Sequence, residues 1–327
     1  MILIADSGST KTDWAWVENG TIVRRVETQG INPVYQTAEE IGKVVEQLFP
    51  RKDEGGRTKE NSTDIRGYIS RATETQSISP SSLLLPPSSK IFFYGAGCIP
   101  EKKGLVEKVL REVFPQTETI EVASDLLGAA RAVCQHSEGI ACILGTGSNS
   151  CLYDGHDIVA NIPPLGYVLG DEGSGAVLGK LFMNALFKGA LPLWMKDDFL
   201  QSTGLTYPII INKVYREPMA NRFLASTSLY IGQHLDVEPL RDLVKQNFRD
   251  FFRKNIVRYG RPDLPVGAIG SIAYHYQDIL REVAAEEGFQ MGTIAKSPME
   301  GLLELIFLSH TEKTELAENP KGIIVRS

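Results

Sequence analysis

Apolar segments that run into turns of small residues occur twice in this sequence, about 140 residues apart. Residues 2–5 lead into Asp6-Ser7-Gly8-Ser9-Thr10, and residues 139–144 lead into Gly145-Thr146-Gly147-Ser148. This pattern predicts a β-hairpin at both places. A repeated hairpin predicts two related halves, which agrees with the roughly two domains expected for 327 residues.

The rest of the chain alternates short apolar strands with amphipathic helices. Thr37 and Glu40 are spaced as a capping box before a helical apolar pattern. We predict strands at 91–94, 119–123 and 265–269, and helices from about 100, over 126–133, 240–252, 276–285 and 299–308. This order predicts an α/β protein with a first domain over 1–117 and a larger, more helical second domain over 118–309.

Two segments fall outside this alternation. Residues 51–89 begin with a charged run and end with serine and proline, so we predict a loop insertion there. For residues from about 310 to 327, packing against the first domain is left as an open alternative.

Charge and hydropathy exclude several classes of protein. A formal net charge of −6 and a pI near 5.5 argue against a nucleic-acid-binding protein, whose surface would be basic. The apolar runs are far shorter than the about 18 residues that a membrane span needs. The N-terminal residues have no basic leader, so we expect a cytoplasmic protein without a signal peptide. The four cysteines include no C-x-x-C pair, which predicts free thiols and no zinc site.

The two turns have the composition of phosphate-binding turns. Small residues let backbone N–H groups approach an anion, and Ser9, Thr10 and Lys11 add hydroxyl donors and a positive charge. Thr146 and Gly147 give the second turn a similar character. Each turn alone is also explained as an ordinary hairpin connection, and neither is a P-loop. Together they predict two turns, one per domain, that hold nucleotide phosphates from opposite sides while Mg²⁺ neutralises the charge.

Three aspartates stand where carboxylates serve phosphate chemistry. Asp6 ends the first strand directly before the first turn, where it would lie near phosphate-bound Mg²⁺. Asp125 follows a predicted strand and begins a helix, and Asp171 lies in a glycine-rich turn before another helix. Each has a structural alternative as the cap of a turn or of a helix, and these alternatives stay open.

Taken in order, these motifs resemble those of the actin/hexokinase/Hsp70 ATPase superfamily. Residues 6–12, 119–130 and 144–148 resemble its first phosphate motif, first connecting element and second phosphate motif. Residues 266–271 resemble its adenosine motif, and residues 297–308 lie where its second connecting helix belongs. The resemblance implies two ribonuclease H-like (actin-like ATPase) domains with an ATP cleft between them. The cysteine-rich zinc motif of ROK-type sugar kinases is absent here.

Within that superfamily the sequence is most similar to the BadF/BadG/BcrA/BcrD-type ATPases, the group that includes N-acetylglucosamine kinases. The similarity rests on the second turn, on residues 170–174 and on Gly30-Ile31-Asn32-Pro33, whereas residues 163–167 depart from the pattern. It implies Asp125 as the catalytic base and Asp6 as the Mg²⁺ site, through water. It implies sugar contacts from Asn32, Asp125, Ser148, Asn149, Gly166 and Asp171, and ATP contacts from Ser9, Thr10, Lys11, Thr146, Gly147, Gly267, Gly270 and Ser271.

The resemblance thus implies an ATP-dependent kinase that phosphorylates the 6-hydroxyl of N-acetylglucosamine or a related amino sugar, with ATP and Mg²⁺ as cofactors. Two alternatives remain. One is an ATPase that activates an acyl-CoA dehydratase or reductase through an iron–sulfur cluster bridging two subunits, and the other is a non-catalytic nucleotide-dependent sensor. The identity of the sugar and the formation of a homodimer are left open.

Overall fold

The computed structural model describes residues 1–8, 10–49, 85–87 and 89–307. The chain divides into two compact units, Met1–Asp125 (unit 1) and the residues from Leu126 onward (unit 2). The boundary follows Asp125 and not residue 117 as predicted, because the strand after residue 118 pairs with the sheet of unit 1. Most of the predicted insertion at 51–89, and all of residues 310–327, lie outside the described residues.

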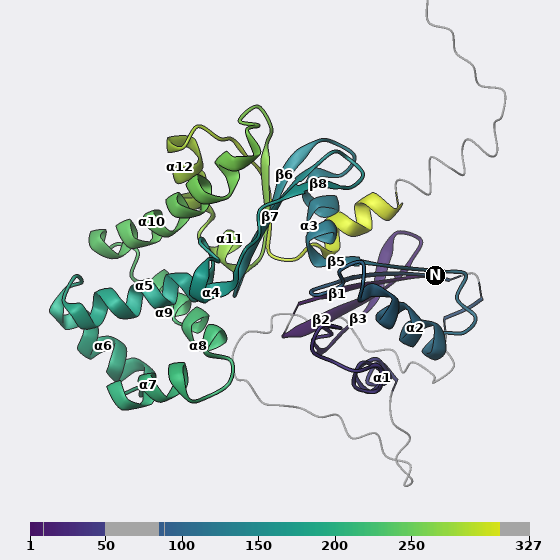
Figure 1. Ribbon diagram of the computed structural model, residues 1–327, viewed down its shortest axis with the longest axis horizontal. Helices are drawn as coiled ribbons and strands as arrows, with labels where there is room; N and C mark the ends of the chain where they lie inside the picture. Colours follow the sequence, from purple (N-terminus) through teal and green to yellow (C-terminus); the bar gives the residue numbers. More distant parts are fainter. Residues whose placement is uncertain (9, 50–84, 88, 308–327) are drawn as a thin grey trace, which may run out of the picture. The chain divides into compact units, whose positions relative to one another are not determined.

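Unit 1 is built on a five-stranded mixed sheet (Figure 1). Its strands are β1 (Ile2–Ser7), β2 (Lys11–Glu18), β3 (Thr21–Gln29), β4 (Lys90–Gly95) and β5 (Thr119–Ser124). The order across the sheet is β3-β2-β1-β4-β5, with β1, β2 and β3 antiparallel and β4 and β5 parallel to β1. The first predicted hairpin is confirmed, and the C-terminal ends of β1, β4 and β5 share one edge of the sheet.

Helices α1 (Ala38–Glu46) and α2 (Lys103–Val113) pack against one face of this sheet. The predicted capping box between Thr37 and Glu40 begins α1. Helix α2 begins later than predicted, because residues 100–102 form a turn. The core between helices and sheet includes Leu3, Ala5, Trp14, Trp16, Val44, Val45, Ile91, Phe93, Val106 and Leu110. Since side chains alternate along a strand, Asp6 belongs to the face opposite Leu3 and Ala5.

The sheet of unit 2 has the same topology. Its strands are β6 (Gly139–Leu144), β7 (Ser148–Tyr153), β8 (Ile158–Asn161), β9 (Val266–Ile269) and β10 (Met291–Ala295). The order is β10-β9-β6-β7-β8, with β6, β7 and β8 antiparallel and β9 and β10 parallel to β6. Read from β8 to β10, this is the order of unit 1. The predicted internal repeat and the α/β fold class are therefore confirmed.

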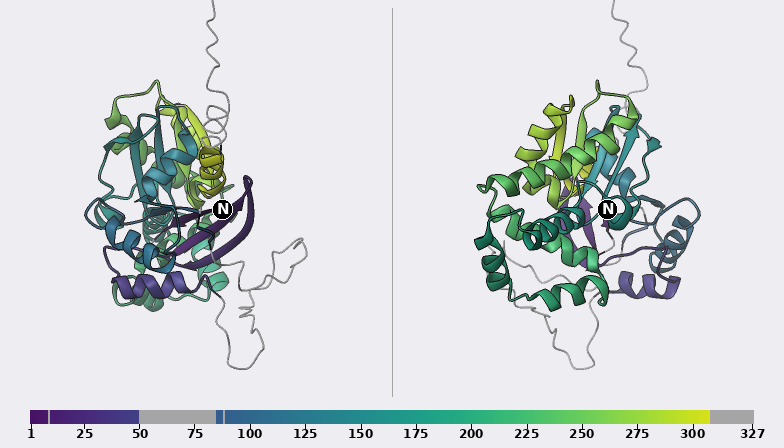
Figure 2. Two further views of the ribbon diagram at one scale, coloured as in Figure 1. Left: turned by 90° about the vertical axis from the view of Figure 1, so that its right-hand side faces the viewer. Right: turned by 60° about the vertical axis from the view of Figure 1, so that its left-hand side comes forward.

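Helices cover both faces of the second sheet (Figures 1 and 2). Helix α3 (Asp125–Cys134) packs on the face that carries Cys151 and Tyr153. Helices α10 (Glu238–Lys254), α11 (Ser271–His275) and α12 (Gln277–Glu286) pack on the face that carries Cys142 and Val266. The apolar stripe predicted for α10 is confirmed, and a short 3₁₀ helix, η2 (Ile256–Tyr259), follows it. The helix predicted at 276–285 is confirmed as α12, and a separate short helix, α11, precedes it.

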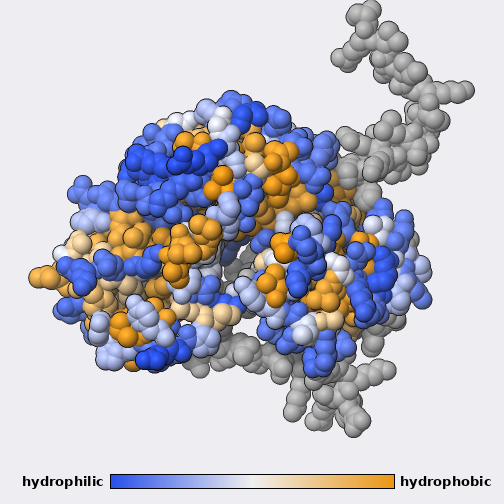
Figure 3. Space-filling model, viewed as in Figure 1, coloured by the Kyte–Doolittle hydropathy of each residue, from blue (hydrophilic) through white to orange (hydrophobic). Residues whose placement is uncertain are grey.

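The greater length of unit 2 comes from a helical region between β8 and α10. It contains α4 (Gly166–Leu169), α5 (Gly175–Lys188), α6 (Leu193–Thr203), α7 (Tyr207–Tyr215), α8 (Ala220–Ser226) and α9 (Ser228–Gln233). Leu193, Trp194, Tyr207 and Tyr215 are exposed on α6 and α7, and Figure 3 shows hydrophobic areas over this region. Within the described ranges, the chain forms no helix with the length and hydropathy that crossing a membrane would require.

The last described helix, over residues 299–307, packs on α3 through small residues. A side chain on Gly301 would lie 2.3 Å from the carbonyl oxygen of Ala132, so only glycine allows this approach. The Gln135 side chain also donates a hydrogen bond of 3.0 Å to the carbonyl of Gly301. Helix α3 contains the end of the first predicted connecting element (119–130), and the segment at 299–307 lies in the second (297–308). Within unit 2 the two are in direct contact.

Candidate functional site

The first predicted phosphate turn, between β1 and β2, is closed by its own backbone. The N–H of Gly8 donates to the carbonyl of Lys11 at 3.0 Å, and the carbonyl of Thr10 accepts the N–H of Gly30 at 3.1 Å. Thr10 is exposed, whereas the Lys11 ammonium is paired with Glu27 at 2.5 Å. Ser9, also predicted here, lies outside the described residues. The turn therefore presents the Thr10 hydroxyl, and the charge of Lys11 already has a partner.

Asp6 and Asp125 lie at the same edge of the first sheet. Asp6 is the penultimate residue of β1, and Asp125 directly follows the last residue of β5. Both strands are parallel to β4, which lies between them, so their C-terminal ends coincide. Strands two positions apart are separated by about 10 Å, which is short enough for two carboxylate charges to interact. The topology thus brings together the two residues predicted to bind Mg²⁺ and to act as the base.

The electrostatics of Asp6 agree with this placement. Its pKa is raised from 3.8 to about 7, first because burial removes water from the carboxylate and second because the negative charge of Asp125 is close. The charge of Asp13 raises the pKa further, while Lys11 and Arg25 lower it. Arg25 is itself engaged by Asp13, with a hydrogen bond of 2.9 Å from Nε. This edge of the sheet therefore carries more negative charge than its basic residues offset.

Two buried hydroxyl groups connect the first turn to the loop that carries Asn32. Ser7 and Thr12, the last paired residues of the hairpin, share a hydrogen bond of 2.7 Å. Ser7 Oγ accepts the N–H of Ile31 at 2.9 Å, and Thr12 Oγ1 donates to the carbonyl of Gln29 at 3.2 Å. Sequence reasoning gave neither hydroxyl a role. The available signal was their position inside the motif at 6–12.

Asn32 is held within its loop and against the turn after β4. Its N–H donates to Gln36 Oε1 at 2.6 Å, and its Oδ1 accepts the N–H of Val34 at 3.0 Å. The Gln36 amide donates in turn to the carbonyl of Gly30 at 3.1 Å. A side chain on Gly97, whose φ is +76°, would lie 2.1 Å from Asn32 Oδ1. Gly97 is thus explained by the close approach of Asn32.

The second predicted phosphate turn, between β6 and β7, is fixed against the N-terminus of α5. The N–H of Gly145 donates to the carbonyl of Gly147 at 3.0 Å. The carbonyls of Gly145 and Thr146 accept the N–H groups of Gly175 and Ala176, the first residues of α5, at 2.8 and 3.1 Å. These bonds satisfy helix N–H groups that have no partner within the helix. The position of the turn is therefore set by a buried helix.

Asp171 lies directly against this turn. Its carboxylate accepts hydrogen bonds from the backbone N–H groups of Ser148 and Gly166, and a side chain on Gly147 would lie 3.1 Å from its Oδ2. Burial raises the pKa of Asp171 to about 6 in spite of these bonds, which favour the charged form. The side-chain cap of α5 is Ser174, so the alternative role of Asp171 as the cap of this helix is wrong. Asp171, Ser148 and Gly166, three of the predicted sugar contacts, are therefore brought together.

Asn149, another predicted sugar contact, is separated from Ser148. The two are successive residues of β7, so their side chains point to opposite faces of the sheet. Asn149 shares the face of Cys151, against which α3 packs. Its Oδ1 accepts a hydrogen bond of 2.9 Å from Asn161. Ser148 and Asn149 therefore lie on opposite faces of the sheet, and the sugar contact of Asn149 stays a prediction.

The predicted adenosine segment, residues 266–271, contains a turn and a glycine that packs against a helix. A side chain on Gly270, whose φ is +123°, would lie 2.3 Å from the carbonyl oxygen of Leu144, so the turn after β9 approaches the turn after β6. Ser271 follows as the exposed first residue of α11. Gly267 is buried in β9, and a side chain there would meet Val133 Cγ2 at 2.4 Å. Packing against α3 accounts for Gly267, whereas Gly270 and Ser271 lie beside the second phosphate turn.

The cysteines are free thiols, as predicted. Cys98, Cys142 and Cys151 are buried, and Cys134 is half-buried. Burial raises the pKa of Cys98 and Cys151 to about 12 and that of Cys134 to about 11, so the thiolate that binds iron or zinc is disfavoured. No group of three or more His, Cys, Asp and Glu residues in the described ranges is arranged to hold a metal ion.

Two solved structures are similar to the chain over nearly its whole length. A protein from Porphyromonas gingivalis, named a "putative N-acetylglucosamine kinase", is 45% identical with a TM-score of 0.80, and the match covers 95% of this chain and 100% of that one. A protein of the same name from Chromobacterium violaceum is 18% identical with a TM-score of 0.64, and the match covers 93% and 98% of the two chains. The second similarity shows a common fold. No family model and no curated protein matches the chain.

Proposed function

Because the chain belongs to the same family as the P. gingivalis protein, we propose that it is an ATP-dependent sugar kinase that phosphorylates the 6-hydroxyl of N-acetylglucosamine or a closely related amino sugar. We further propose that this family is part of the BadF/BadG/BcrA/BcrD-type group. The observation that carries the proposal is the pair of carboxylates, Asp6 and Asp125, at one edge of the first sheet. Phosphoryl transfer to a sugar needs a metal site and a proton acceptor close together.

Asp6 fits a magnesium ion. Its carboxylate is partly buried, lies near the charges of Asp125 and Asp13, and has a pKa of about 7, so a divalent cation would offset a repulsion that Lys11 and Arg25 leave in place. Mg²⁺ is typically bound through one or two carboxylates together with phosphate oxygens and water, and needs no larger cluster of protein ligands. When bound here, it would neutralise the charge of the nucleotide phosphates.

Asp125 fits the role of general base. It begins α3 directly after β5, so its position is set by a strand on one side and a helix on the other. A carboxylate there accepts the proton of the sugar 6-hydroxyl as the bond to phosphorus forms. Because the transition state of phosphoryl transfer is loose, orientation of the hydroxyl matters more than the strength of the base.

Each unit would supply one phosphate-binding turn and one set of residues that contact the sugar. Thr10 in unit 1 and Thr146 in unit 2 would donate hydroxyl groups to the phosphates. Among the residues proposed to contact the sugar, Asp171 has the best support, because two backbone N–H groups orient its half-buried carboxylate. Carboxylates held in this way accept hydrogen bonds from sugar hydroxyls, which would orient the substrate.

The iron–sulfur alternative has less support. A cluster that bridges two subunits needs cysteines at the surface, and Cys98, Cys142 and Cys151 are each at most 3% exposed. The sensor alternative assigns no role to Asp125, because binding alone does not require a base beside Asp6. The sensor alternative therefore leaves Asp125 without a role, and the iron–sulfur alternative leaves these three buried cysteines without access to a second subunit.

The test is ADP release with Mg²⁺ and ATP over a panel of hexoses and amino sugars. We expect N-acetylglucosamine or a close relative to stimulate release, and 6-deoxy-N-acetylglucosamine, the matched control, to give none because it lacks the accepting hydroxyl. If no sugar stimulates ADP release, the kinase proposal is wrong. If the 6-deoxy analogue is phosphorylated, the assignment of the hydroxyl is wrong.

A further inference from the structure

The segment that carries Asp171, residues 162–174, has a backbone that its own sequence does not favour. Leu165 and Asp171 have φ values of +64° and +54°, in the left-handed region that residues other than glycine rarely adopt. Such a conformation is unfavourable for leucine and less so for aspartate, and it persists where the surrounding structure fixes it. The segment therefore depends on contacts from elsewhere in unit 2.

Asn247, in the middle of α10, supplies two of those contacts. Its side chain is fully buried, with 0% exposed. Its Oδ1 accepts the N–H of Gly173 at 3.0 Å, and its Nδ2 donates to the carbonyl of Ser174 at 3.2 Å. Phe251, one turn further along α10, lies against the same place, since a side chain on Gly173 would meet its Cβ at 2.9 Å. One helix thus holds the peptide group between Glu172 and Gly173 and the one between Ser174 and Gly175, both on the C-terminal side of Asp171.

The same helix and η2 contact the segment at two more points. Lys254 forms an ion pair with Glu172 at 3.0 Å. The Tyr259 hydroxyl accepts the N–H of Ile162 at 3.1 Å and shares a hydrogen bond of 2.8 Å with Ser150 of β7. The first and last residues of the segment are therefore bound to one continuous element, α10 with η2.

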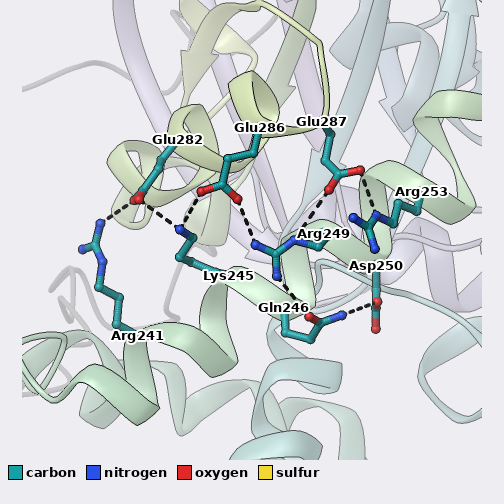
Figure 4. A network of polar contacts seen from close by, with 9 residues as sticks. All are labelled: Arg241, Lys245, Gln246, Arg249, Asp250, Arg253, Glu282, Glu286 and Glu287. Carbon is teal, nitrogen blue, oxygen red and sulfur yellow. Dashed lines mark hydrogen bonds and ion pairs between the residues drawn. The ribbon is translucent and has the colours of Figure 1, made fainter.

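Helix α10 is itself fixed along its length (Figure 4). Basic residues spaced four apart on α10 meet acidic residues of α12 in a row of ion pairs. The participants are Arg241, Lys245, Arg249 and Arg253 on α10 with Glu282, Glu286 and the following residue Glu287. Helix α10 is thus joined to α12 along its length, and Asn247 lies between Lys245 and Arg249, two residues of this row.

We propose that Asn247 is a positioning residue for the acceptor sugar, because its paired hydrogen bonds to Gly173 and Ser174 hold Asp171 in its strained conformation beside the second turn. This inference rests on the proposed function. In this proposal the buried amide of Asn247 does not contact the substrate. It orients Asp171, whose carboxylate contacts the sugar. If Asn247 had a purely structural role, its replacement would lower stability and would not change the KM for the sugar relative to the KM for ATP.

The experiment compares Asn247→Ala with Asn255→Ala. Asn255 is a matched control because it is a buried asparagine directly after the last residue of the same helix. Its side chain donates to the carbonyl of Phe251 at 3.3 Å and, among the described residues, forms no hydrogen bond to the segment at 162–174. In Asn247→Ala we expect the KM for the sugar to rise about tenfold or more, a size typical of small misplacements of a substrate-binding group, with the KM for ATP within about twofold of wild type. Hydrogen exchange at residues 170–175 should accelerate in Asn247→Ala alone.

Each outcome decides the inference. Exchange that is unchanged at 170–175, or a sugar KM that is unchanged while wild type is active, would overturn the role of Asn247 and leave the kinase proposal standing. Wild type without sugar-stimulated ADP release would instead overturn the proposed function and the acceptor role with it. If Asn247→Ala does not fold, Asn247→Ser, which keeps a small polar group in the site, provides the same two readouts.

Discussion

Replacing Asp6 by asparagine should stabilise the protein above neutral pH while it abolishes the proposed metal site. The pKa of Asp6 is raised from 3.8 to about 7 in the folded chain, so its favourable contribution is complete below about pH 4 and is lost as the pH rises through 7. At about 1.4 kcal/mol per pKa unit, the full loss is about 4 kcal/mol. Between pH 5 and pH 8 the linkage relation predicts that the free energy of unfolding of the parent falls by about 2.5 kcal/mol through Asp6. Asp6→Asn should not show this loss.

The assay is urea denaturation at several pH values between 5 and 8, followed by tryptophan fluorescence. Trp14 and Trp16 lie in the core of unit 1, whereas Trp194, the third tryptophan of the chain, lies in unit 2. A Trp194→Phe background therefore reports on the unit that contains Asp6. The free energy of unfolding of Asp6→Asn should exceed that of the parent by an amount that grows with pH.

Two further variants make this prediction specific. Asp125→Asn removes the second-largest cause of the raised pKa, so the pH dependence should shrink but not vanish, because burial remains the first cause. Glu18→Gln, at an exposed position in the same sheet, should leave it unchanged. If Asp6→Asn and its parent lose stability equally between pH 5 and pH 8, Asp6 is not a buried carboxylate beside Asp125, and the argument for the metal site fails.

Three other predictions follow from the site. Asp125→Asn should lower kcat by at least about 10²-fold while ATP affinity, measured by calorimetry, stays near wild type; a fully active variant would remove Asp125 from the mechanism. Because burial raises the pKa of Asp171 to about 6, kcat/KM for the sugar at saturating Mg²⁺ and ATP should fall about tenfold per pH unit below 6, and a profile that is flat down to pH 5 would contradict its role. Gly270→Ala should lower the Tm and weaken ATP binding because its side chain would lie 2.3 Å from a carbonyl oxygen, whereas Gly189→Ala, also at positive φ but with open space around it, should cost about 1–2 kcal/mol and leave ATP binding unchanged.

The elements that carry local signals could be predicted from the sequence. The capping box of α1, the apolar stripe of α10 and the hairpins with their small-residue turns each depend on neighbours within one or two turns of chain. The boundary between the units could not be found in this way, because β5 belongs to unit 1 through its pairing with β4, which is separated from it by α2. Strand pairing of this kind is a long-range interaction that leaves no mark on local composition.

The candidate site shows the same division. Asp6, Asp125 and Asp171 could be singled out because each ends a strand or lies in a turn. The resemblance implied sugar contacts from both Ser148 and Asn149 and took no account of the alternation of side chains along β7, which places the two on opposite faces. Asn247 was missed although a signal exists. It is an amide on the apolar face of α10, at the position where a helical repeat from Leu240 and Val244 calls for another apolar side chain.

The repeated fold also explains why the two units carry different chemistry. In unit 1 the residue before the last paired position of the leading strand is Asp6, and in unit 2 the equivalent residue of β6 is Ile143. Unit 2 instead has an apolar strand end. Its carboxylate, Asp171, comes from the segment after β8 and lies against Gly147, and α10 contacts the residues that follow it. Under the proposed function, the predicted phosphate turns are similar in the two units, whereas the proposed catalytic carboxylates, Asp6 and Asp125, lie in unit 1 and the proposed sugar-binding carboxylate, Asp171, lies in unit 2. The position of Asp171 depends on α10, a helix that has no equivalent among the described residues of unit 1.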